Sequence, residues 1–292
     1  MRTLLVTGAS GFVGRHFIKA AVDDFAIVGV GRGGRPEWLP RSIIWLSADL
    51  TDPASFDTIA REYWGIAHFA NLSIPAAYSD DSIIAQSVAM TTGLLEHVQS
   101  ARFLFPSSCH VYAPGNEVKD EDSPTRPEGR YGQAKLAAEK LVLSVDHIDA
   151  RIARPFNHIG RHMTAGLMIP SLAERVRNAE PGEPIAMQGK NSVRDFLHVR
   201  DIVRAYIAML ELDSPPARTF NVCSGNAVSI RELAERFVRM ADQNNPVVFE
   251  DHAQSADDTD SLVGNPSRLQ EMTGWSPLIS LDDSIRSLLA DG

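Results

Sequence analysis

Residues 4–14 read LLVTGASGFVG, an apolar run that leads directly into a turn with three glycines. The run predicts a buried strand, and residues 12–22 have the pattern of a helix. Glycine lets a backbone approach a pyrophosphate closely, and the first N–H groups of the following helix favour its negative charge. This order of elements predicts a dinucleotide-binding site. We expect the cofactor to contact Gly8, Ser10, Gly11, Phe12, Val13 and Gly14.

Apolar runs of strand length alternate with helical patterns along the first half of the chain. Such alternation is typical of a parallel sheet covered by helices, so we predict an α/β fold with a Rossmann-type doubly wound parallel sheet. The predicted strands are residues 3–7, 26–30, 43–46, 66–70, 102–106 and 150–154. The predicted helices are residues 12–22, 53–62, 82–100 and 131–146.

After about residue 160, prolines divide the chain into short elements. They predict a smaller C-terminal substrate-binding lobe over the carboxyl ends of the strands, where ligands bind in such sheets. Residues 195–210 again have the pattern of a core helix. We therefore assign residues 1–160 to the NAD(P)-binding domain, with 193–223 returning to it, and residues 161–192 and 224–292 to the smaller lobe.

The composition narrows the class of protein. The chain has 292 residues and a net charge of −9, which argues against a nucleic-acid partner because that partner requires a basic surface. Two cysteines imply no disulfide framework and fit a reducing compartment. No apolar run reaches the roughly 18 residues of a membrane span, and no signal peptide is evident. We expect a cytoplasmic protein without a membrane partner.

Two arginines follow the strand predicted at residues 26–30. NAD-preferring sites usually place an acidic residue at this point to bind the ribose 2′-hydroxyl, but none occurs between Phe25 and Glu37. Arg32, with Arg35 as a second candidate, would bind a 2′-phosphate through charge-assisted hydrogen bonds. We therefore favour NADP(H), with NAD(H) possible; the alternative is a solvated basic loop.

Asp49 and Leu50 follow the strand predicted at residues 43–46 and suit a contact with the adenine ring. The alternative for Asp49 is the N-cap of the helix predicted at residues 53–62.

Tyr131 and Lys135 lie four residues apart in a segment of helical propensity, so they share one helix face. A phenol with an ordinary pKa of about 10 is a poor acid–base near neutrality unless a neighbouring ammonium stabilises its phenolate. Lys135 is placed to do so. Ser108, just after the strand predicted at residues 102–106, can hydrogen-bond a substrate oxygen.

At these positions the chain resembles the extended short-chain dehydrogenase/reductase family, which includes nucleotide-sugar epimerases, dehydratases and reductases. The resemblance covers nearly the whole length. It implies that Tyr131 is the acid/base, that Lys135 binds the nicotinamide ribose and lowers the tyrosine pKa, and that Ser108 orients the substrate oxygen. It also implies cofactor contacts at Ala70, in the HFAN segment of residues 68–71, and at Pro155.

Four further segments resemble the GDP-4-keto-6-deoxymannose reductases, which make GDP-rhamnose. The resemblance implies that Asn157 and Arg194 lie near the sugar-nucleotide phosphates and that Ser73 contacts the substrate; for Arg194 the alternative is a local ion pair with Asp195. The segments are RPFNHIG at 154–160, SVRDFLHVRD at 192–201, NVCSG at 221–225 and TGWSP at 273–277.

The chain departs from its relatives at several of these positions. Nucleotide-sugar 4,6-dehydratases carry Asp-Glu after the catalytic Ser or Thr, whereas this chain has Cys109 and His110, which argues against dehydration. Cys109 could move protons as in GDP-fucose synthase if an imidazole stabilised its thiolate; the alternative is a structural thiol. Residues 161–163, RHM, replace an expected PGQ, and Ser87 and Met90 replace an expected Asn and Gly.

We therefore predict an enzyme that reduces the C4 carbonyl of a nucleoside-diphosphate 4-keto-6-deoxyhexose with NADPH, without a metal, best matched by GDP-4-keto-6-deoxy-D-mannose giving GDP-D-rhamnose. The alternatives are an NAD-dependent UDP-hexose 4-epimerase, a GDP-fucose-synthase-like epimerase-reductase and a non-catalytic NAD(P)-binding protein. Relatives pair through two long helices, so we also expect a homodimer through residues 82–100 and 131–146.

Overall fold

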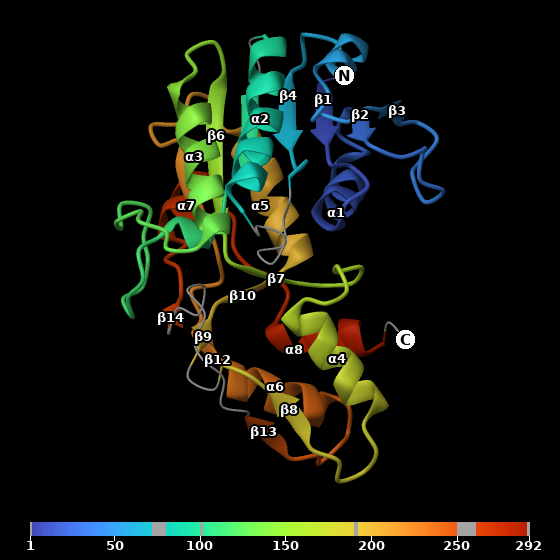
Figure 1. The fold of residues 1–292 in the computed structure, drawn as a ribbon, viewed down its shortest axis with the longest axis vertical. Coiled ribbons are helices and arrows are strands. Elements are labelled where there is room, and N and C mark those ends of the chain that lie inside the picture. The colour runs from blue at the N-terminus through green and yellow to red at the C-terminus, as the bar shows by residue number, and fades with distance from the viewer. Residues whose placement is uncertain (1, 72–79, 100–101, 190–191, 250–260, 291–292) are drawn as a thin grey trace.

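The computed structural model describes residues 2–71, 80–99, 102–189, 192–249 and 261–290. A seven-stranded parallel sheet in the order β11-β6-β5-β4-β1-β2-β3 forms its centre (Figure 1). Strand order reverses beside β1, where doubly wound sheets open a crevice at their carboxyl ends. This confirms the predicted fold. The strands are β1 (Thr3–Thr7), β2 (Ala26–Gly31), β3 (Ile44–Ser47), β4 (Gly65–His68), β5 (Arg102–Pro106), β6 (Asp149–Pro155) and β11 (Thr219–Val222).

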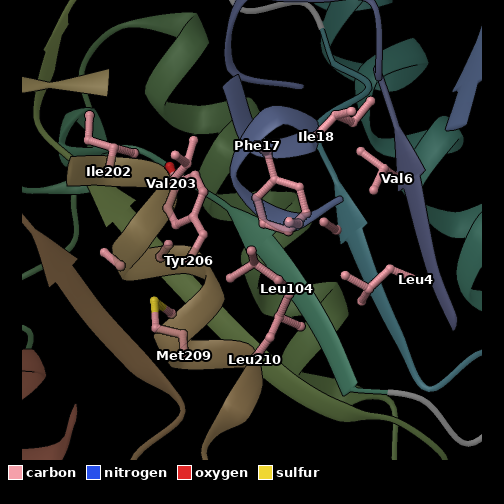
Figure 2. Close-up of a cluster of buried hydrophobic side chains, with 14 of the residues drawn as sticks. Leu4, Val6, Phe17, Ile18, Leu104, Ile202, Val203, Tyr206, Met209 and Leu210 are labelled. Atoms are coloured by element: carbon pink, nitrogen blue, oxygen red, sulfur yellow. The ribbon is translucent and has the colours of Figure 1, made fainter. Parts of the chain in front are cut away.

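Helices cover both faces of this sheet, each over its own apolar cluster. One face is covered by α1 (Phe12–Ala21) and α5 (Val199–Glu211), whose Phe17 and Tyr206 pack with Leu104 of β5 (Figure 2). The other face is covered by α2 (Asp81–His97) and α3 (Arg130–Ser144). The central strands are therefore buried on both sides, which explains their continuous apolar sequences.

The prediction of a helix at residues 53–62 is wrong. The segment forms only a 3₁₀ turn, η1 (Pro53–Thr58), which Asp52 caps by accepting the Ala54 N–H at 3.0 Å. Ile59 then adopts an extended backbone and is buried in the sheet core, so the chain turns inward before a regular helix can continue.

A smaller group of elements lies beyond the carboxyl ends of the strands (Figure 1). We call these elements the small lobe: α4 (Met168–Asn178), α6 (Ile230–Met240), α8 (Leu281–Leu289), β8 (Ile185–Met187) and β13 (Val247–Phe249). Amphipathic helices form an apolar cluster of their own here, separate from the clusters on the sheet.

Short strands connect the sheet with the small lobe. Only Phe156 separates β6 from β7 (Asn157–Ile159), which pairs in parallel with β10 (Phe196–His198). Between β9 and β10, the buried carboxylate of Asp195 accepts the backbone N–H groups of Ser224 and Gly225, both at 2.8 Å. The remaining elements are η3 (Cys109–Val111), β9 (Val193–Arg194), β12 (Val228–Ser229), β14 (Ser261–Leu262) and α7 (Ser267–Thr273).

Candidate active site

A cavity of about 640 Å³ lies at the carboxyl ends of the sheet strands, between the sheet and the loop that leads to α4. Arg194 is not among the residues that line it, and Ser73 lies outside the described residues. The predicted site residues that do line it are Gly8, Ser10, Gly11, Phe12, Val13, Gly14, Arg32, Asp49, Leu50, Ala70, Ser108, Tyr131, Lys135, Pro155 and Asn157.

The glycine loop forms a tight cradle at the start of α1. Gly8 has a φ of 63°, and a Cβ there would lie 2.6 Å from the Ala70 nitrogen. A Cβ on Gly14 would lie 2.9 Å from the Ala9 Cα and closer still to the Gly8 carbonyl. The N-cap residue, Gly11, has no side chain to pair the first N–H groups of α1. The cradle therefore fits a pyrophosphate, as a dinucleotide cofactor requires.

The two arginines after β2 have different surroundings. Arg35 donates to the Ile43 carbonyl at 2.7 Å and to the Pro40 carbonyl at 2.5 Å, so it holds its own loop. Arg32 lines the cavity. Of the two, Arg32 is therefore the one placed to bind a 2′-phosphate.

Asp49 accepts the Thr51 backbone N–H at 3.0 Å and the Thr51 hydroxyl at 2.8 Å. These hydrogen bonds hold the pKa of the Asp49 carboxyl below its usual value. Asp52, rather than Asp49, caps the η1 turn, so the capping interpretation of Asp49 is wrong.

Ser108, Tyr131 and Lys135 all line the cavity, with Ser108 at the start of η3 and the other two in the first turns of α3. The Lys135 Nζ donates to the Pro106 carbonyl at 2.9 Å and lies 5.9 Å from the centre of the Tyr131 ring. Burial lowers the pKa of Lys135 to about 7, so both its charged and neutral forms are populated near neutrality. The Ser108 Oγ accepts the His110 backbone N–H at 3.2 Å, which orients the hydroxyl.

Gly132 holds the start of α3 against η3, a role that the sequence analysis missed. A Cβ on Gly132 would lie 2.7 Å from the Pro127 Cβ and closer still to the His110 carbonyl oxygen. The imidazole of His110 meets the Tyr131 ring edge-on, with 5.8 Å between ring centres. Close backbone packing at Gly132 thus fixes Tyr131 relative to the turn that carries Ser108.

A buried polar network joins α3 to strand β6. The Arg154 guanidinium on β6 forms an ion pair with Glu139 of α3 and donates to the Tyr112 hydroxyl at 3.2 Å. It also donates to the Glu121 carbonyl at 3.0 Å. Glu139 lies one turn beyond Lys135, so this network anchors the same helix face that carries the predicted catalytic pair.

Burial shifts the pKa values of titratable groups near the cavity in the direction that favours their neutral forms. Burial raises the pKa of the Cys109 thiol to about 12, which favours the structural thiol over a thiolate. His68 is held between the hydroxyls of Thr7 at 2.7 Å and Thr91 at 3.2 Å, and burial lowers its pKa to about 3. His198 accepts the Arg200 N–H at 3.0 Å and caps α5.

The family model described as "NAD dependent epimerase/dehydratase family" matches residues 4–223. The chain belongs to this family. A GDP-6-deoxy-D-mannose reductase from Pseudomonas aeruginosa is 30% identical over 307 residues, covering 99% of this chain and 96% of the relative. A UDP-glucose 4-epimerase from Halalkalibacterium halodurans is 25% identical, covering 94% of this chain and 90% of the relative.

Solved structures give the same assignment. RMD from Pseudomonas aeruginosa, in complex with NADPH, has a TM-score of 0.84 and 28% identity, covering all of this chain and 97% of that one. A UDP-glucose 4-epimerase from Thermotoga maritima, solved with UDP-glucose, has a TM-score of 0.85 at 21% identity, with 99% and 98% covered, and shows the shared fold. The chain is therefore an NAD(P)-dependent enzyme of the oxidoreductase/epimerase type, as its sequence indicated.

The described residues, 2–71, 80–99, 102–189, 192–249 and 261–290, include neither a membrane-spanning helix nor a cluster of metal ligands. None of the helices in this part of the chain is long and apolar enough to cross a membrane. The same part holds no group of three or more His, Cys, Asp or Glu side chains placed to bind a metal ion.

Proposed function

We propose that this protein reduces the C4 carbonyl of a nucleoside-diphosphate 4-keto-6-deoxyhexose with NADPH, and that its substrate is GDP-4-keto-6-deoxy-D-mannose, which gives GDP-D-rhamnose. The observation that carries the proposal is one cavity that joins the glycine cradle and Arg32 to Ser108, Tyr131 and Lys135. The full-length similarity to a GDP-6-deoxy-D-mannose reductase supports the choice of substrate.

When bound, the nicotinamide supplies the hydride for C4. Tyr131 donates its phenolic proton to the oxygen that becomes an alkoxide, and Ser108 hydrogen-bonds the same oxygen. Lys135 shares a helix face with Tyr131 and supplies positive charge beside the phenol in its protonated form. Ser108 and Lys135 are buried, so water screens the interactions of their side chains little.

The preference for NADPH over NADH rests on Arg32. No acidic residue follows β2 before Glu37, and Arg32 lines the cavity whereas Arg35 is held by backbone carbonyls. Substituting Arg32→Ala should raise the KM for NADPH by roughly tenfold or more and leave that for NADH nearly constant, because a charge-assisted pair is lost only with the 2′-phosphate. An equal effect on both cofactors would contradict this role.

On the substrate side, we propose that Asn157, which lines the cavity, contacts the sugar nucleotide. We further propose that Ser73 contacts the substrate and that Arg194 lies near its phosphates. We assign the remainder of substrate binding to residues 161–192 and 224–292, with support from the separate apolar cluster of the small lobe. A homodimer through α2 and α3 belongs to the same proposal, and light scattering of the purified protein tests it.

The second candidate is a UDP-hexose 4-epimerase, which the similarity to several UDP-glucose 4-epimerases favours. Such an enzyme uses the same three residue types but retains NAD⁺ and shows no net oxidation or reduction. The cofactor released from denatured purified protein separates the two: retained NAD⁺ favours the epimerase, and an empty or NADPH-selective site favours the reductase.

The direct test is NADPH consumption by the purified protein with GDP-4-keto-6-deoxymannose, with NADH as the control. We expect NADPH oxidation that falls by at least a hundredfold in Tyr131→Phe, since the proton donor is lost. No consumption with either nucleotide would reject the reductase and direct attention to the RHM segment at residues 161–163, which departs from the relatives.

A further inference from the structure

The segment RHM at residues 161–163, which departs from the relatives, begins with a sharp turn. The chain leaves β7 at Gly160, where a Cβ would lie 2.5 Å from the Val199 Cγ1, so this end of the segment packs closely on α5. Two residues later His162 has a φ of 67°, a left-handed conformation that glycine adopts freely but that strains other residues. Such a conformation persists when contacts from the surrounding structure hold it.

His16 of α1 supplies contacts to both residues of this turn. Its Nε2 lies 2.9 Å from the Arg161 carbonyl oxygen. Because a carbonyl oxygen can only accept a hydrogen bond, Nε2 carries the proton and is the donor. The His16 ring also contacts the His162 ring, with 6.2 Å between their centres. One imidazole thus holds a turn that lies 145 residues farther along the chain.

The helix that carries His16 is a fixed support. Phe17 and Ile18, the next residues of α1, are buried in the apolar cluster of the sheet (Figure 2). On its other side the His16 ring meets the Phe12 ring edge-on, with 5.5 Å between ring centres. Arg161 and His162, in contrast, are exposed. The contact therefore ties an exposed turn to an element anchored in the core.

The turn leads directly into a wall of the cavity. Met163, Thr164 and Leu167 line the cavity, and α4 begins at the next residue, Met168. Met163 and Leu167 are half-buried and Thr164 is exposed. A loop of this kind keeps its shape when both of its ends are fixed. Helix α4 fixes one end, and His16 fixes the other.

We propose that His16 is a positioning residue for the substrate: by holding the Arg161 carbonyl, it keeps Met163, Thr164 and Leu167 in the place where the sugar nucleotide binds. The inference rests on the proposed function, which assigns part of substrate binding to residues 161–192. His16 is not among the residues that line the cavity, so it acts through the loop and not on the ligand. No bond is made or broken at its imidazole.

Trypsin tests the hydrogen bond without any substrate, because the peptide bond that it cuts after Arg161 contains the carbonyl that His16 holds. Cleavage of a native protein requires the segment to open first, so its rate follows the local stability. His16→Leu keeps the bulk of the side chain but has no donor, and it should raise the cleavage rate at Arg161 by about 3- to 10-fold, the value of one hydrogen bond. His16→Gln, which restores a donor, should lower that rate again to within about twofold of the wild type.

Steady-state kinetics with NADPH and GDP-4-keto-6-deoxymannose test the consequence for the substrate. We expect His16→Leu to raise the KM for the sugar nucleotide by about 3- to 10-fold, and His16→Gln to reverse most of this rise. The kcat and the calorimetric affinity for NADPH should stay within about twofold of the wild type, since Tyr131 and Lys135 lie on α3 and the helix of the glycine cradle stays anchored in the core. A residue that only stabilised the fold would not produce this split.

The matched control is His147→Leu. The His147 Nε2 donates to the Leu95 carbonyl at 3.0 Å, so the variant removes the same kind of hydrogen bond between α2 and the segment after α3. Neither residue lines the cavity. We therefore expect this variant to leave both the KM for the sugar nucleotide and the cleavage rate at Arg161 at their wild-type values.

Three results would overturn the inference: wild-type cleavage at Arg161 in His16→Leu, no recovery in His16→Gln, or a weakened affinity for NADPH with an unchanged KM for the sugar nucleotide. The design separates this inference from the proposed function. If no 4-keto sugar nucleotide is reduced, the reductase proposal fails. The cleavage rates, with the calorimetric affinities of the same variants for GDP and UDP-glucose, then still decide the role of His16.

Discussion

Replacing Gly132 by alanine should separate Tyr131 from Ser108. The added Cβ would lie 2.7 Å from the Pro127 Cβ, about 0.7 Å inside the 3.4 Å at which ordinary contact begins, and nearer still to the His110 carbonyl. Alanine gains about 1 kcal/mol of helix propensity, but an overlap with backbone costs about 1 to 3 kcal/mol. The overlap dominates, so the first turn of α3 must shift by most of an ångström.

A catalytic group displaced by about 1 Å can lose roughly 100-fold in rate. We therefore expect Gly132→Ala to lower kcat for NADPH oxidation by one to two orders of magnitude, with an unfolding free energy reduced by up to about 2 kcal/mol. The control is Gly33→Ala, whose Cβ would meet no atom within 4 Å. Wild-type kcat and unfolding temperature in Gly132→Ala would refute the argument that close packing at this glycine positions Tyr131.

Three further predictions concern buried charges. Glu139→Gln leaves the Arg154 guanidinium without its buried counter-charge, so the free energy of unfolding measured by chemical denaturation should fall by about 3 kcal/mol. The pKa of Lys135 is about 7 in the folded protein and higher in the unfolded protein, so the unfolded protein binds more protons above pH 7. The free energy of unfolding of the wild type should therefore rise by about 2 kcal/mol relative to that of Lys135→Met between pH 7 and 9. Parallel curves of unfolding free energy against pH would contradict this. Asp195→Asn places an amide N–H against the Gly225 N–H, so the free energy of unfolding measured by thermal denaturation should fall by about 2 to 3 kcal/mol.

The sheet and the cofactor cradle could be predicted because their signals are local. Residues 4–14 contain the strand, the turn and the start of the helix in order, and Gly8 does adopt the positive φ that only glycine tolerates easily. Tyr131 and Lys135 follow from helix geometry in the same way, since a spacing of four residues places both on one face.

Features that depend on contacts between distant segments could not be predicted. The sequence around Asp195 suggested a local ion pair, but its carboxylate binds backbone N–H groups some 30 residues away, after β11. Arg194 fits the motif of relatives but does not line the cavity. Its place is determined by the pairing of β9 with β12 and β14, which come from distant parts of the sequence.

A single residue, Phe156, joins strand β6 of the sheet to strand β7. Pro155 and Asn157, on either side of Phe156, both line the cavity, so the chain crosses from the sheet toward the small lobe at the site itself. One short stretch of extended backbone therefore belongs to both the floor of the cavity and the connection to the small lobe. A substitution at Phe156 would disturb the cavity wall and the connection to the small lobe together.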